Sequence, residues 1–188
     1  MMPDDVVSLW TSRMQSFAPQ FLASHPILTQ VASQASVLFH GSTTLGIDDP
    51  WSDLDGWVLV PNEMLRRLRE TSKDWFFEFT LDGKIGHFNL ESLERFEQRV
   101  QECDFPLIAE LRHAVPLADP AGCAQRLLDL SRQPMRAEVR LAWACYHYVE
   151  MRGEHRACDN PIERRDPVAL LVALTATLAH AMQMTMVL

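Results

Sequence analysis

The stretch from residue 37 to residue 60 constrains the fold more than any other part of the chain. A short apolar run, Val37 to Phe39, leads into Gly41-Ser42. A second apolar run, Trp57 to Val60, follows Asp53-Leu54-Asp55 after a single glycine. Short apolar runs bounded by Gly, Ser, Asp and Pro are typical of buried strands. The stretch therefore predicts a strand, a turn-rich connection and a second strand, with Asp53 and Asp55 on one face because side chains alternate along a strand.

Two carboxylates on one face, close to a Gly-Ser turn, indicate a particular chemistry. Like charges repel at this distance, so a cation must lie between them or one must hold a proton. Mg²⁺ fits, because it takes one or two carboxylates and completes its shell with phosphate oxygens and water. Gly41 permits backbone angles or close approaches that a Cβ would block, and Ser42 adds a hydroxyl beside N–H groups that can face an anion. These residues predict a metal-bound polyphosphate site.

The spacing of Gly41-Ser42 and Asp53-Leu54-Asp55 between two apolar strands resembles the signature of nucleotidyltransferases with the polymerase-β-type fold. The resemblance implies an α+β fold with a small mixed β-sheet flanked by helices. It also implies that Gly41 and Ser42 bind the triphosphate of a nucleotide, and that Asp53 and Asp55 are catalytic residues that bind Mg²⁺, in a one-ion or a two-ion site. A solvated hairpin with Asp at its mouth is the alternative interpretation.

The third acid of that family is where the resemblance weakens. In the family this acid usually lies on the strand after a hairpin, and Asp82-Gly83 between apolar runs predicts such a hairpin. On the following strand, His87, Asn89 and Glu91 share one face. Three arrangements stay open: a two-carboxylate site, a site completed by Glu91 as a metal ligand, or a degenerate site that binds nucleotide poorly. The difference bears on activity, because a two-metal mechanism needs ligands for both ions.

The strand pattern disappears after residue 123, and Pro134 is interpreted as a domain boundary. We therefore expect a nucleotidyltransferase-like α/β domain over residues 1–133 and a helical C-terminal region over residues 134–188. The sequence around Glu150 resembles the helical-domain segment of aminoglycoside nucleotidyltransferases that carries a catalytic glutamate. This resemblance implies that Glu150 is the general base. A Glu150 side chain paired with Arg152 or His147 is an equally good interpretation.

Helical spacing and capping residues, such as Ser92 at the start of the 92–102 segment, predict a series of helices along the chain. They cover residues 4–17, 26–36, 62–73, 92–102, 105–112, 123–131, 138–152 and 168–188, with strands over 75–81 and 84–90 and an edge strand over 114–120. Residues 156–165 are expected to form a charged loop. The last helix has the length of a membrane span, but its threonines, His180 and Gln183 favour a buried bundle helix. Because it ends without a cap or polar tail, the helical region is expected to be truncated or unusually short.

The net charge and the cysteine content limit the classes of partner and site that the sequence supports. The formal net charge of −8 disfavours a nucleic-acid partner, because such proteins draw affinity from Lys and Arg at phosphates. The four cysteines are scattered without a Cys-x-x-Cys pair, so the sequence signals neither a zinc site nor a redox motif. The N-terminus lacks the basic and apolar regions of a signal peptide, and a cytoplasmic location is expected.

Taken together, the resemblance implies a Mg²⁺-dependent enzyme that moves a nucleoside monophosphate from a nucleoside triphosphate, with ATP expected, to a hydroxyl of a small molecule. A cationic acceptor such as an aminoglycoside antibiotic suits the acidic chain, and antibiotic-modifying relatives often form homodimers. No membrane partner is expected. Two alternatives remain: a toxin–antitoxin nucleotidyltransferase that modifies a protein, and a catalytically degenerate nucleotide-binding module.

Overall fold

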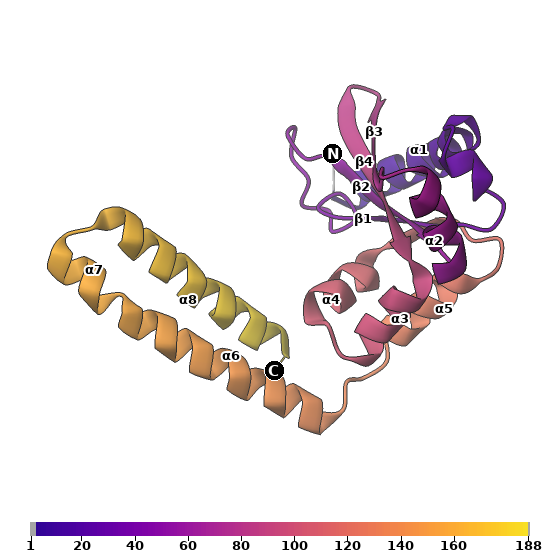
Figure 1. Ribbon diagram of the computed structural model, residues 1–188. Coiled ribbons are helices and arrows are strands. Elements are labelled where there is room, and N and C mark those ends of the chain that lie inside the picture. The colour runs from indigo at the N-terminus through magenta and orange to yellow at the C-terminus, as the bar shows by residue number, and fades with distance from the viewer. Residues whose placement is uncertain (1–2, 188) are drawn as a thin grey trace. The chain divides into compact units, whose positions relative to one another are not determined.

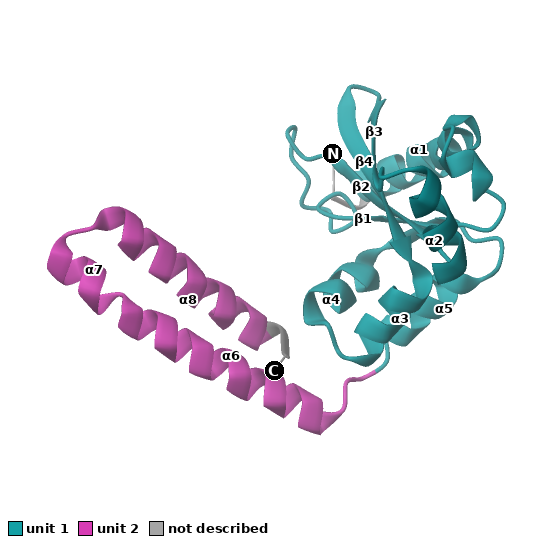
Figure 2. Ribbon diagram, viewed as in Figure 1, with its two compact units in different colours: residues 1–133 teal, residues 134–188 magenta. Residues whose placement is uncertain are grey.

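The computed structural model describes residues 3–187, and the side chains of residues 5–185. The chain divides into two compact units, Met1–Gln133 and Pro134–Leu188 (Figure 2). The first unit is α+β and the second is helical, so the predicted fold class is confirmed (Figure 1). Within the described residues, no strand follows Ala118.

A five-stranded sheet forms the centre of the first unit, in the order β3-β4-β2-β1-β5. Its strands are β1 (Ser36–His40), β2 (Leu54–Val60), β3 (Phe76–Leu81), β4 (Lys84–Ser92) and β5 (Val115–Ala118). The β2–β4 pair is parallel and the other three pairs are antiparallel, so the sheet is mixed. The predicted β3–β4 hairpin and the predicted edge position of β5 are both confirmed.

The two faces of this sheet are covered by different helices. On one face, apolar side chains of all the central strands form a single buried cluster with α1 (Pro3–Ser24) and α2 (Asn62–Thr71). The opposite face is covered by α3 (Leu93–Gln101), α4 (Phe105–His113) and α5 (Cys123–Ser131). Phe96 of α3, for example, packs edge-on against Trp57 of β2. Polar residues that alternate with the core residues of β2 and β4 therefore emerge on the α3–α4–α5 face.

Residues 26–36 do not form the helix that the sequence predicts. A short 3₁₀ helix (η1, Leu28–Gln30) and turns connect α1 to β1 instead. Leu28 and Val31 are buried at helical spacing, which explains the wrong prediction. The first helix is longer than predicted and runs through Pro19 to Ser24, because Ala18 and Leu22 continue its buried stripe.

The second unit is an antiparallel helical hairpin made of α6 (Ala137–Ala157), α7 (Asp159–Arg164) and α8 (Pro167–Val187) (Figure 1). The predicted loop over 156–165 is wrong, since α6 runs further and α7 is helical. Pro161 is the third residue of α7, where its missing N–H breaks no helical hydrogen bond.

The prediction of a buried α8 is also wrong. Among residues 167–185 only Ala173 is buried, and six large apolar residues are exposed: Val168, Leu171, Val172, Leu174, Leu178 and Met182. By length and composition the segment Pro167–Thr185 could cross a membrane, with a mean hydropathy of 1.5. The apolar pattern predicted a helix correctly, but an apolar composition alone does not determine what covers it.

Candidate functional site

Three polar residues lie in a row across the centre of the sheet. His40 of β1 pairs with Asp55 of β2 in the antiparallel register, and Asp55 pairs with His87 of β4 in the parallel register. Directly paired residues project to the same face of a sheet. Asp53 is the residue just before β2 and lies two residues before Asp55. It therefore projects to the same face as Asp55, beside this row. The sheet thus brings together residues that are far apart in the sequence.

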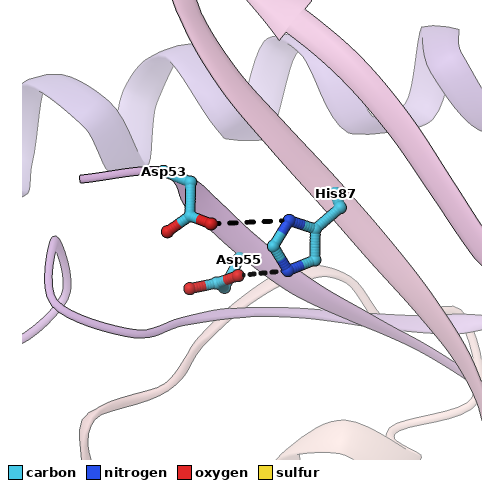
Figure 3. Close-up of side chains that lie close together, drawn as sticks. All are labelled: Asp53, Asp55 and His87. Carbon is cyan, nitrogen blue, oxygen red and sulfur yellow. Dashed lines mark ion pairs between the residues drawn. The ribbon is translucent and has the colours of Figure 1, made fainter. Parts of the chain in front are cut away.

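Asp53, Asp55 and His87 approach one another closely enough to share an ion (Figure 3). The Nε2 atom of His87 lies 2.6 Å from Oδ1 of Asp55, and its Nδ1 atom lies 3.7 Å from Oδ2 of Asp53. One ligand atom from each residue lies within 4.8 Å of the others. The prediction that the two aspartates face the same region is confirmed, with an imidazole between them that the sequence assigned no role.

The electrostatics of Asp55 favour a cation at this place. Burial raises the pKa of Asp55, His87 lowers it and the charge of Asp53 raises it, and the net direction is upward. The carboxylate therefore lacks part of the stabilisation that water would give it. A bound positive charge would supply that stabilisation.

Gly41 forms a corner directly against Asp55. Its φ of +94° is a left-handed conformation that L side chains rarely adopt, and a Cβ at this position would lie only 2.7 Å from Oδ2 of Asp55. Ser42 follows in a turn that is closed by hydrogen bonds from the Leu45 N–H and the Thr44 hydroxyl to the Gly41 carbonyl. The predicted Gly-Ser corner and the predicted acidic pair therefore lie side by side.

On the other side of Asp55, His40 is held in an apolar setting. Its imidazole stacks on Trp57 with ring centroids 3.6 Å apart. Burial, and secondarily the nearby His87, lower the pKa of His40 to about 3. It is therefore neutral at pH 7, which suits a polar residue that fills the edge of the turn rather than a charged one.

Glu110 of α4 adds a third carboxylate to this region that the sequence did not indicate. Its Oε2 atom lies 3.6 Å from Nδ1 of His40, and its side chain is half exposed. Burial raises the pKa of Glu110, and the charge of Asp55 raises it further. No local motif marks Glu110, because the folding of α4 against β1 alone brings it to the site.

Glu91 and Glu150, the other two predicted site residues, lie elsewhere. Glu91 pairs with Leu59 near the far end of β4, four positions beyond His87, and lines a cavity of about 400 Å³ with Arg69, Lys73 and Trp75. Among the described residues, the group that can share an ion does not include it. Glu150 belongs to α6 of the second unit, where its charge acts on His147. Its role as a general base stays a prediction.

Comparison with known proteins gives a likeness in structure and no family. No family model matches the chain, and no curated protein sequence matches it. Among solved structures, the chain is similar to a nucleotidyltransferase-like protein from Exiguobacterium sibiricum 255-15, with 8% sequence identity and a TM-score of 0.48. The alignment covers 95% of this chain and 57% of that protein. The functional argument therefore rests on the geometry of the site itself.

Proposed function

We propose that the chain is a nucleotidyltransferase that depends on a divalent metal ion. The observation that carries this proposal is the contact between the Gly41 corner and Asp55, with Asp53 and His87 beside it. A glycine corner with a left-handed backbone, where a Cβ would crowd Asp55, lies next to two carboxylates on one face and suits a phosphate chain that must come within reach of a metal. Gly41 follows the last residue of β1, and Asp53 and Asp55 lie at the start of β2, which pairs antiparallel with β1, so the two features are neighbours in the sheet.

The side chains present fit a divalent ion. Asp53 and Asp55 offer carboxylate oxygens and His87 offers an imidazole nitrogen, all within 4.8 Å of one another. Asp55, whose pKa is raised by burial, gains from a neighbouring positive charge. A bound divalent ion would supply neutralisation of the charge that develops on the transferring and leaving phosphate oxygens.

In the proposed reaction, an acceptor hydroxyl attacks the α-phosphorus of a nucleoside triphosphate. The new bond joins the hydroxyl oxygen to the α-phosphorus, and the bond from that phosphorus to the bridging oxygen breaks, so that pyrophosphate leaves with the bonding electrons. The corner at Gly41 and Ser42 orients the triphosphate, and Asp53 and Asp55 fix the metal end of the site. Most of the rate gain in such transfers comes from positioning and charge stabilisation.

The hydroxyl proton needs an acceptor, and two carboxylates are candidates. Glu110 lies in the same unit as Asp55 and has a raised pKa, which brings its basicity closer to neutral pH. Glu150 is the candidate that the resemblance to aminoglycoside nucleotidyltransferases implies. We propose Glu110 as the first candidate, because its position beside Asp55 is set by packing within one unit.

For the acceptor we propose a small cationic molecule that bears a hydroxyl, such as an aminoglycoside, with ATP as the donor. The formal net charge of −8 supports it. So do the partly exposed carboxylates of Asp53 and Glu110, which would attract ammonium groups. The same charge disfavours a polyanionic acceptor.

The test is transfer of label from α-³²P nucleoside triphosphates to a panel of aminoglycosides and other amino alcohols, with pyrophosphate release measured in parallel. Asp55→Asn should lower the rate by at least about 10³-fold, because it removes a carboxylate from the centre of the site. Asp82→Asn, in the β3–β4 turn, is the matched control and should retain the rate. If pyrophosphate is released and the label appears on protein, the acceptor is a protein hydroxyl and not a small molecule. No release with any triphosphate would overturn the enzymatic proposal in favour of a binding module.

A further inference from the structure

His87 occupies the register position directly opposite Asp55. Its imidazole is therefore the third possible metal ligand beside the carboxylates of Asp53 and Asp55. The parallel pairing of β2 and β4 sets Asp55 against His87, whereas Glu91 is carried four residues further along the strand. Both ring nitrogens of His87 point at the two aspartates (Figure 3). Among residues with described side chains, the only group of three or more that could hold an ion contains this one imidazole and two carboxylates.

The imidazole of His87 is held in place by its neighbours. The ring of Phe76, on the adjacent strand β3, stacks on it with centroids 4.7 Å apart. The His87 side chain is about one fifth exposed, as is that of Asp55. A ring that is stacked on one side and faces carboxylates with both nitrogens has little freedom to turn away. The two ring nitrogens of His87 therefore keep their positions at the site.

We infer that His87 is a direct metal ligand and that the site prefers a first-row transition ion, such as Mn²⁺, over Mg²⁺. Mg²⁺ takes oxygen ligands in a nearly ideal octahedron, whereas imidazole nitrogen is a ligand of first-row transition ions, among which Mn²⁺ shares the preference of Mg²⁺ for carboxylate oxygen. Two carboxylates and one imidazole leave positions open for phosphate oxygens. The inference deepens the proposed function, on which it rests for the metal-binding role of Asp53 and Asp55.

The first measurement uses the purified chain of residues 1–188 and two ions. Free Mn²⁺ is followed by its electron paramagnetic resonance signal during a titration with protein, and bound Mn²⁺ is then displaced with Mg²⁺. We expect Mn²⁺ to bind at least about tenfold more tightly than Mg²⁺, as the preference of a mixed nitrogen and oxygen site implies. Pulsed resonance spectra of the bound Mn²⁺ should show coupling to a ¹⁴N nucleus.

Variants at position 87 test the source of the preference. His87→Asp presents three carboxylates, so the ratio of Mn²⁺ to Mg²⁺ affinity should fall several-fold and the ¹⁴N coupling should disappear. His113→Asp changes an exposed histidine at the end of α4 and should leave both readouts unchanged. Circular dichroism establishes whether each variant is folded. If His87→Asp does not fold, the ¹⁴N coupling of the unmodified chain still decides the question.

The outcomes separate this inference from the proposed function. Equal affinities for Mn²⁺ and Mg²⁺ without ¹⁴N coupling, in a chain that transfers nucleotide, would overturn the inference alone. Tight Mn²⁺ binding with ¹⁴N coupling, in a chain that releases no pyrophosphate with any triphosphate, would support the inference and overturn the transferase proposal. A ¹⁴N coupling of bound Mn²⁺ that stays intact in folded His87→Asp would place the ion elsewhere and overturn the inference.

Discussion

The two units of this chain handle apolar residues in opposite ways. In residues 1–133, both faces of the sheet are covered by helices, and large side chains such as Phe39 and Phe88 are fully buried. In the part of residues 134–185 whose side chains the structure describes, only His147, Cys158 and Ala173 are buried. Side chains of the first unit are therefore packed from several directions. Those described in the second unit pack mainly between α6 and α8.

The difference determines where closely matched side-chain geometry can arise. The Asp53–Asp55–His87 group depends on three backbone segments fixed by the sheet. Among the side chains described in the hairpin, a comparable contact joins α6 to α8, between Nδ1 of His147 and Nδ1 of His180 at 3.0 Å. Catalytic groups need rigid support to keep their positions. The contrast thus favours unit 1 as the location of the chemistry.

The largest expected effect concerns independent folding. Residues 1–133 produced alone should unfold cooperatively in denaturant, because this unit contains its own core. Residues 134–188 produced alone should show no sharp transition or should self-associate, because most of their apolar surface is exposed. Circular dichroism during urea unfolding and sedimentation measure both. A cooperative transition of the hairpin at low concentration, with residues 1–133 unfolded, would reverse the comparison.

The second prediction asks which unit supplies the base. Glu110→Gln should lower kcat by about 100-fold with little change in KM, because general-base catalysis contributes on this scale. Glu150→Gln should have a much smaller effect if the chemistry is confined to unit 1. Steady-state kinetics with labelled triphosphate measure both. A larger loss for Glu150→Gln would assign the base to the second unit.

The third prediction compares two glycines that share a left-handed backbone. Gly41→Ala and Gly83→Ala should each cost about 1–2 kcal/mol of unfolding free energy, because both residues have positive φ. Only Gly41→Ala should also weaken metal binding, by about tenfold or more, since its Cβ meets Asp55, whereas the position at Gly83 is open. Calorimetric titration with Mn²⁺ separates the two effects. Equal metal affinity in both variants would show that the Gly41 corner plays no part in metal binding.

The smallest effect is a pH dependence of the hairpin. Burial first, and His180 second, lower the pKa of His147 below its ordinary value of 6.5, while Glu150 acts in the opposite direction. The unfolded state therefore binds more protons than the folded state just below pH 6.5, so the α6–α8 pairing should weaken as the pH falls through this range. Hydrogen exchange of α6 and α8 at pH 7 and pH 5 measures it.

The control for this prediction is His147→Phe, which keeps an aromatic ring beside Trp143 but cannot titrate. Exchange in α6 and α8 of this variant should depend less on pH than in the unmodified chain. His155→Asn changes an exposed histidine of α6 and should preserve the original dependence. An unchanged profile in His147→Phe would contradict the assignment.

The sequence predicted elements whose signals are local. The alternation around Asp55, the Asp-Gly turn of the hairpin and the cap at Ser92, whose hydroxyl accepts a hydrogen bond from the Arg95 N–H, all appear in the structure. Each depends on residues close together in the chain. The shared face of Asp53 and Asp55 was predicted for the same reason.

What the sequence could not predict depends on tertiary packing. His87 lies opposite Asp55 only because β4 pairs parallel to β2 in one register, and Glu110 arrives on a helix packed against β1. The predictions of a helix over 26–36 and of a buried α8 are wrong because apolar spacing does not show what covers a residue. A periodic pattern describes a face and leaves the partner of that face open.

The parallel pairing of β2 with β4 also bears on how this chain tolerates insertions and deletions. Side chains alternate with a period of two, so one residue added between Lys84 and His87 would rotate the imidazole to the opposite face or force a bulge. Residues added to the Asp82-Gly83 turn would lengthen the hairpin while keeping the β2–β4 register. Insertions and deletions among homologous sequences should therefore occur in that turn and be absent from the three residues before His87.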